Sequence, residues 1–210
     1  MVGKVLARFL AKQLANPSGM IGKLIMAPIW NRRNSALNDV AFDSLALHSH
    51  DRVLEVGFGG GYLLGRMATA VTDGFLAGVD VSPAMISFCE KRYRSLVEAG
   101  KLELQYAQAE SLPYPDGHFT KACSVNSIFY WKDAPQALSE LYRVLEVGGM
   151  LVICFTRKRC MEDKEFARHG LALYEDGQVC QIIESAGFDE IDTTQASDRH
   201  REFLCIIGIK

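Results

Sequence analysis

Apolar residues recur along the chain at two spacings, which predict a regular series of strands and helices. Short apolar runs of strand length begin at Val53 and Phe75, and helical spacing follows each of them. The pattern predicts strands at 53–56, 75–79, 101–106, 119–125, 150–155, 190–194 and 202–209, and helices at 63–71, 82–98, 135–147 and 174–186. Strands that alternate with helices indicate parallel βαβ units. The polar turn before the last strand is too short for a crossover, so the final pair is expected to be antiparallel.

The first 47 residues show a different pattern, with amphipathic segments and no expected strand. These segments cover residues 2–14, 20–30 and 35–47. They predict an N-terminal helical cap, residues 1–47, on a single compact unit, residues 48–210. A basic amphipathic segment can also lie on a membrane surface. Peripheral membrane contact through residues 1–30 is therefore the alternative to a cap over the substrate cavity.

The composition indicates one domain with a substantial core. The chain has 210 residues, of which 49% are hydrophobic. Its formal net charge of −2 argues against a general affinity for nucleic acid. It contains no run of about 18 uninterrupted apolar residues and no signal-peptide pattern, so neither a transmembrane helix nor a signal peptide is expected. The cysteine usage indicates a reduced, cytoplasmic protein.

The six cysteines show no spacing typical of a metal or redox site. There is no C-x-x-C pair and no His/Cys cluster with zinc-like spacing, so no metal is expected. Cys123, Cys154 and Cys205 fall in apolar, strand-like runs. A free cysteine there acts as a small hydrophobic residue, and we expect these thiols to be reduced.

A glycine-rich turn follows the first predicted strand. Residues 55–61 read Glu-Val-Gly-Phe-Gly-Gly-Gly. Glycines at a strand-to-helix turn allow positive φ and let a ligand lie against main-chain N–H groups. The dinucleotide pattern G-x-G-x-x-G fails, because Tyr62 or Leu64 stands where its third glycine would fall. The turn favours a nucleotide-type cofactor, although a glycine turn without a ligand has the same sequence.

A carboxylate at the end of the second strand strengthens the cofactor interpretation. Asp80 closes the run from Phe75 and lies 23 residues after Gly57. A carboxylate there can accept two hydrogen bonds from a ribose diol. Its alternative role, as a helix cap, is already served by Ser82 and Pro83.

Four segments together resemble the class I S-adenosylmethionine (SAM) methyltransferases. Glu55-x-Gly57-x-Gly59-x-Gly61 resembles their motif I, and residues 109–116, 124–131 and 141–149 resemble later motifs of the family in the same order. The chain is most similar to the type 11 branch, which includes ubiquinone and menaquinone C-methyltransferases. The resemblance implies a Rossmann-like α/β fold with a seven-stranded, mostly parallel sheet, an antiparallel last strand and helices on both faces.

The resemblance also implies the cofactor, SAM, with S-adenosylhomocysteine (SAH) as product. Glu55 would hold its amino-acid end, Asp80 its ribose, and Met85 would form an apolar wall for adenine. Many relatives carry an acidic residue where this chain has Gln108, so the adenine contact is expected from the backbone at 108–109. The expected cofactor-binding residues are Glu55, Gly57, Gly59, Gly61, Asp80, Val81, Met85, Gln108, Ala109, Glu110 and Asn126.

The acceptor side is less defined by the sequence. Candidates for a catalytic role are Asn126, Tyr130, His169 and Tyr174. Tyr130 either lines an aromatic pocket or packs under the N-terminal cap. The expected reaction moves a methyl group to a small, aromatic or apolar acceptor by in-line displacement that depends on positioning. The alternatives are a SAM- or SAH-binding scaffold that partners another subunit, and an NAD-dependent oxidoreductase, which the glycine spacing argues against.

Overall fold

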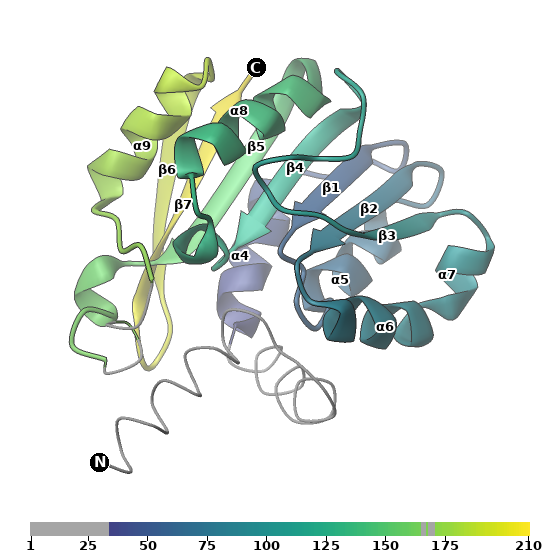
Figure 1. The fold of residues 1–210 in the computed structure, drawn as a ribbon, viewed down its shortest axis with the longest axis horizontal. Coiled ribbons are helices and arrows are strands. Elements are labelled where there is room, and N and C mark those ends of the chain that lie inside the picture. Colours follow the sequence, from purple (N-terminus) through teal and green to yellow (C-terminus); the bar gives the residue numbers. More distant parts are fainter. Residues whose placement is uncertain (1–33, 165–166, 168–170) are drawn as a thin grey trace.

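A computed structural model of the chain describes residues 34–164, 167 and 171–210. Its centre is a seven-stranded sheet with the order β3-β2-β1-β4-β5-β7-β6 (Figure 1). The strands are β1 Arg52–Val56, β2 Phe75–Asp80, β3 Leu102–Tyr106, β4 Phe119–Val125, β5 Leu145–Thr156, β6 Asp189–Ser197 and β7 Glu202–Ile209. β7 runs antiparallel to both β5 and β6, and the other pairs are parallel. The predicted sheet, with its antiparallel last strand, is confirmed.

The strand order reverses between β1 and β4. The chain adds strands outward from β1 to β3 and then resumes with β4 on the other side of β1. In open α/β sheets, ligands bind beside the carboxyl ends of the strands at such a reversal. The glycine-rich turn lies at this position, because it follows β1 directly.

Helices cover both faces of the sheet (Figure 1). The helices are α4 Ser35–Ser44, α5 Tyr62–Ala70, α6 Pro83–Arg92, α7 Arg94–Glu98, α8 Ala134–Val144 and α9 Asp176–Ser185, with 3-10 turns η2 Ile128–Tyr130 and η3 Lys158–Cys160. Neighbouring strand residues point to opposite faces. Val53 and Val152 belong to the core cluster under α4, α5 and α6, whereas Leu54 and Ile153 belong to the cluster under α8 and α9. The predicted helices on both faces are thus confirmed.

Two predicted boundaries were wrong. The helix expected over 82–98 is interrupted at Tyr93, where α6 ends and α7 begins. The helix expected to reach residue 147 ends at Val144, and β5 starts at Leu145, which pairs with Phe119 of β4. The glycines at 148–149 therefore lie inside β5, where they exchange backbone hydrogen bonds with Lys210.

The prediction of free thiols was wrong for one pair. Cys154 of β5 and Cys205 of β7 lie directly opposite each other in the antiparallel register and form a disulfide. The two residues are separated by 51 positions in sequence. Only the pairing of β5 with β7 brings them together, so the spacing along the chain carries no signal for this bond. Cys123 is free and buried, as expected.

The end of the expected cap is held firmly against the sheet. Most of residues 1–47, including the whole segment considered for membrane contact, lies outside the described residues. Leu37 and Ala41 of α4 are fully buried. The Lys121 ammonium donates to the carbonyls of Leu45 and Ala46 at 2.6 Å each and lies 3.2 Å from the Asp51 carboxylate. β4 thus anchors the carboxyl end of α4.

Candidate functional site

The glycine-rich turn adopts a shape that other residues would strain. Gly57, Gly59 and Gly61 have φ of 78°, 50° and 69°, in the left-handed region that glycine occupies without cost. Space imposes a second limit. A Cβ on Gly57 would lie 2.2 Å from the Ser127 hydroxyl oxygen. The turn therefore brings bare backbone to the carboxyl end of β1.

Asp80 fixes this turn to the start of α6. Its carboxylate accepts hydrogen bonds from the backbone N–H of Gly59 at 2.9 Å and of Ser82 at 2.8 Å. Burial raises the pKa of Asp80, although these backbone donors oppose the shift. The Ser82 hydroxyl accepts from the Met85 N–H at 3.3 Å and caps α6, as the sequence predicted. The N-cap of α6 is therefore Ser82 and not Asp80, whose carboxylate contacts the turn at Gly59.

Glu55 is a fully buried carboxylic acid behind the turn. Its Oε2 has no hydrogen-bond partner among the described residues. Burial, followed by the negative charge of Asp80, raises the pKa of Glu55 to about 8. A buried polar atom without a partner is costly. Such an atom beside a ligand site indicates a place for a donor or a cation.

The segment after β3 packs against the start of α8. Ala109 is buried, whereas Gln108 is exposed. The Glu110 carboxylate accepts from the backbone N–H of Lys132 at 2.6 Å and of Asp133 at 3.1 Å. The Gln108 side-chain oxygen accepts from the Lys132 ammonium at 3.4 Å. In this arrangement Glu110 holds two loops together.

Arg143 of α8 holds the rest of this segment, and sequence reasoning missed it. Its guanidinium donates to the carbonyls of Leu112 at 3.1 Å and Tyr114 at 2.8 Å. It also pairs with Asp116 at 2.8 Å and with Glu140 at 2.7 Å. The hydrogen bond from Arg143 lowers the pKa of Glu140. In the sequence, Glu140 and Arg143 look like an ordinary surface pair on a helix.

Asn126 joins three elements at the carboxyl ends of β4 and β5. Its φ is 52°, which asparagine tolerates better than most residues. Its side-chain oxygen accepts from the Thr156 N–H at 2.8 Å, and its amide nitrogen donates to the Asn34 side chain at 3.2 Å. Arg201 donates to the same Asn34 oxygen at 2.9 Å and to the Thr156 hydroxyl at 3.3 Å. The Asn126 amide therefore links β4 and β5 to the residue before α4.

Two of the predicted acceptor-side aromatic residues come from neighbouring segments. Tyr130 ends η2, and burial raises its pKa to about 12. Tyr174 precedes α9, and burial, followed by the charge of Asp133, raises its pKa. A hydrogen bond of 3.0 Å from the Ala172 N–H to the Phe129 carbonyl lays these segments side by side. His169 lies outside the described residues.

The comparison with known proteins identifies the family. Residues 54–153 match the model of a methyltransferase domain, the type 11 family. The chain is 30% identical over 177 residues to the uncharacterized methyltransferase YdaC of Bacillus subtilis. This alignment covers 82% of the chain and 88% of YdaC. The chain belongs to the SAM-dependent methyltransferases. The predicted family, the enzyme class and the cofactor SAM are thereby confirmed.

A second relative agrees with this assignment, and a solved structure shares the fold. The methyltransferase is 30% identical over 154 residues to the O-methyltransferase rstn1 of Aspergillus nomiae, covering 70% of this chain and 68% of rstn1. The crystal structure of a SAM-dependent methyltransferase from Aquifex aeolicus superposes with a TM-score of 0.69 at 18% identity, covering 97% of this chain and 98% of that one. At that identity the superposition supports the fold alone.

The geometry of the turn fits SAM. The methionine end of SAM carries an ammonium group, and the lone Glu55 Oε2 is a buried acceptor without a protein partner in the described chain. The carboxylate of Asp80 has about four acceptor sites. The bonds from Gly59 and Ser82 therefore leave capacity for a ribose hydroxyl. The absence of a Cβ at Gly57 lets the Ser127 side chain pack directly against the turn.

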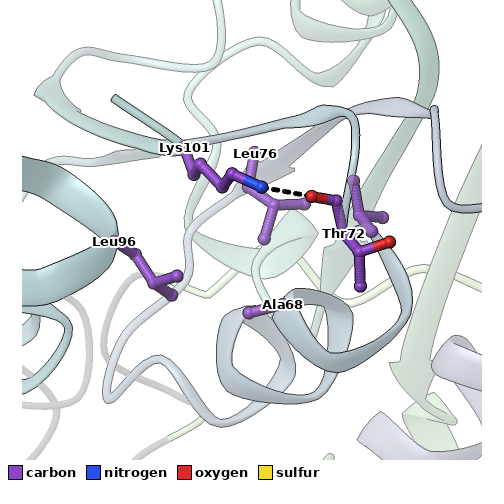
Figure 2. Close-up of a pocket in the computed structure, with 6 residues that line it drawn as sticks. Ala68, Thr72, Leu76, Leu96 and Lys101 are labelled. Atoms are coloured by element: carbon purple, nitrogen blue, oxygen red, sulfur yellow. Dashed lines mark hydrogen bonds between the residues drawn. The ribbon is translucent and has the colours of Figure 1, made fainter. Parts of the chain in front are cut away.

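A separate cavity of about 180 Å³ lies at the amino-terminal end of β2. It is lined by Ala68, Val71, Thr72, Leu76, Leu96 and Lys101. Figure 2 shows the Lys101 ammonium donating to the Thr72 carbonyl beside it. Leu76 is the second residue of β2, so this cavity is distant from the carboxyl end of that strand and from Asp80. Among the described residues, no helix is long and apolar enough to cross a membrane, and no cluster of three or more metal-ligating side chains occurs.

Proposed function

We propose that this methyltransferase methylates a small, apolar or aromatic acceptor bound beside the carboxyl ends of β4 and β5. The observation that carries the proposal is the buried pair of carboxyl groups, Glu55 and Asp80, around a glycine turn of positive φ at the reversal of strand order. This arrangement suits a cationic, ribose-containing cofactor on one side of β1. It leaves the ends of β4 and β5 for the acceptor.

Each end of the cofactor has a matching group in the turn. Glu55 would accept from the ammonium group and Asp80 from the ribose hydroxyls. Met85 and Ala109 are buried apolar residues and would form apolar walls. SAM supplies a methyl group on a sulfonium centre that an acceptor atom can displace in line. The protein therefore has to bind the cofactor and the acceptor, orient them and exclude water. It needs no acid for the leaving group.

The aromatic residues suit an apolar acceptor. The phenols of Tyr130 and Tyr174 are protonated at neutral pH, and burial raises the pKa of both further above it. They would line the acceptor site and donate hydrogen bonds, without acting as bases. Asn126 would position the strand ends, since its amide is already bonded on both sides. The name of the relative rstn1, an O-methyltransferase, favours an oxygen acceptor.

The decisive test measures cofactor binding and transfer separately. Calorimetric titration should show SAM and SAH binding and no binding of NAD. Transfer of labelled methyl from SAM is then measured with a panel of phenols, quinols and aromatic carboxylic acids. Labelled product with one class supports the proposal. SAM binding with no transfer to any member would favour a scaffold role, and NAD binding alone would refute the cofactor assignment.

A further inference from the structure

Tyr93 occupies the break between α6 and α7 and turns its ring toward the glycine-rich turn. Its backbone leaves the helical region, with φ of −111° and ψ of 28°. The side chain is partly buried in the core cluster shared with α5 and α6. A continuous helix over 82–98 would carry this ring along the helix surface. The interruption at Tyr93 therefore sets where its phenol lies.

The Tyr93 phenol donates a hydrogen bond of 2.5 Å to the carbonyl of Gly61. The same carbonyl accepts the N–H of Gly65, one helical turn later, at 3.1 Å. Both acceptor sites of the Gly61 carbonyl are thus used. Gly61 is the last glycine of the turn and the residue before α5, where its φ of 69° fixes the direction of the helix.

The ring also explains a glycine that the cofactor motif does not require. A Cβ on Gly65 would lie 2.5 Å from the Tyr93 hydroxyl oxygen, and a Cβ on Gly61 would lie 3.0 Å from the Tyr93 ring. Glycine in the interior of a helix is unfavourable by roughly 0.5–1 kcal/mol relative to alanine. Gly65 lies in the interior of α5, so the space that the phenol occupies accounts for its presence.

A run of glycines has no side chains to fix its own shape. Two other groups restrain it: Asp80 accepts the N–H of Gly59, and the Cys89 thiol contacts the Gly59 carbonyl at 3.5 Å. Cys89 lies on α6 and Tyr93 directly follows the helix, one turn later, so the carboxyl-terminal part of α6 restrains the backbone on both sides of Gly60. Holding a flexible loop in its bound shape lowers the entropic cost of binding.

We propose that Tyr93 is a positioning residue for the cofactor, whose phenol pre-organises the turn at Gly61 for SAM. The inference rests on the proposed cofactor role of the turn. It assigns Gly65 as the complementary position, kept small so that the phenol can reach the carbonyl. Tyr93 itself acts through the backbone of the turn.

The test is Tyr93→Phe, which keeps the ring and removes the donor. We expect the dissociation constant for SAH, measured by calorimetry, to rise about three- to tenfold, the range for one lost hydrogen bond. Amide hydrogen exchange at residues 61–65 of the unliganded protein should become faster. The matched control is Tyr142→Phe on α8, whose ring packs against Gly187 on the other face of the sheet. It should change neither quantity.

A double substitution isolates the contact between the phenol and Gly65. Gly65→Ala alone should weaken SAH binding, because the methyl group displaces the phenol. The same change should cost less in the Tyr93→Phe background, where the closest atom is absent. Unchanged SAH affinity in Tyr93→Phe, or additive effects in the double variant, would overturn the inference. Failure of the wild-type protein to bind SAH would instead refute the proposed function, while hydrogen exchange would still report whether Tyr93 orders the turn.

Discussion

At the scale of single residues, the two buried carboxyl groups differ in their partners, and this difference predicts different roles. Asp80 accepts from two backbone N–H groups, whereas the Glu55 Oε2 has no partner in the described part of the chain. Both belong to strands and both were singled out by the sequence. Their protonation, however, depends on contacts that only the fold creates.

Asp80→Ala should weaken SAH binding by about tenfold or more, because a hydrogen bond to a charged group contributes about 1.5–3 kcal/mol. The loss has two sources, since the variant removes the ribose acceptor and also releases the Gly59 N–H. Far-ultraviolet circular dichroism should remain that of the wild type, because Asp80 ends its strand. Calorimetry with SAH measures the effect. Wild-type affinity in the variant would contradict the ribose assignment.

Glu55→Gln should stabilise the protein at alkaline pH. The folded state raises the pKa of Glu55 from 4.5 to about 8, so between these values the folded chain keeps a proton that the unfolded chain has released. The free energy of unfolding therefore falls as pH rises, by up to about 1.4 kcal/mol per pH unit. The variant should lose this slope and melt at a higher temperature than the wild type at pH 8.

Thermal melts from pH 4.5 to pH 9 test this prediction. The control is Glu98→Gln, at an exposed position at the end of α7, which should keep the wild-type slope. If Glu55→Gln and the wild type show the same pH dependence, Glu55 is ionised in the folded protein and the assignment of its pKa is wrong.

At the scale of elements, long-range contacts decide what the local pattern cannot. The strands, the glycine turn and the cap of α6 were predictable, because apolar runs, glycines and the Ser82–Pro83 start act locally. The break at Tyr93 was not, since the apolar spacing continues through it. The disulfide of Cys154, the positive φ of Asn126 and the contacts of Arg143 depend on partners distant in sequence.

Asn126 allows a test of one such contact. Asn126→Gly suits the φ of 52° and removes the side chain with its amide, whereas Asn126→Ala also introduces backbone strain. Removing the acceptor of the Thr156 N–H should lower the free energy of unfolding by about 1–3 kcal/mol in the glycine variant, and by more in the alanine variant. Urea denaturation measures both. A glycine variant as stable as the wild type would show that the bonds to Thr156 and Asn34 contribute nothing.

At the scale of the whole molecule, the open question is the role of the residues before α4. We propose that residues 1–47 cover the acceptor site, because Asn34 is hydrogen-bonded to Asn126 and Arg201 beside the ends of β4 and β5. Deleting residues 1–30 should leave SAH affinity within a few-fold and abolish turnover of the acceptor, since a covered site excludes water from the reacting groups.

The rival role for this region is contact with a membrane surface. Liposomes with and without anionic lipid are sedimented with the full chain and with the deletion variant. Loss of liposome binding on deletion, with turnover of a soluble acceptor retained, would reject the covering role and favour the membrane role. Loss of turnover without any liposome binding by the full chain would support the cover.

The reversal of strand order at β1 and β4 divides the proposed roles along the chain. Glu55, Asp80 and Ala109 all precede β4, whereas Tyr130 and Tyr174 follow it. In this assignment the cofactor contacts therefore come from the chain before β4, whereas the aromatic residues proposed for the acceptor come from the chain after it. Arg143 and the backbone of Lys132 and Asp133 follow β4 but hold the segment after β3, so substitutions that change the acceptor should leave these residues in place. A chimera whose residues after β4 come from a related methyltransferase should methylate that relative's acceptor and keep this chain's affinity for SAM.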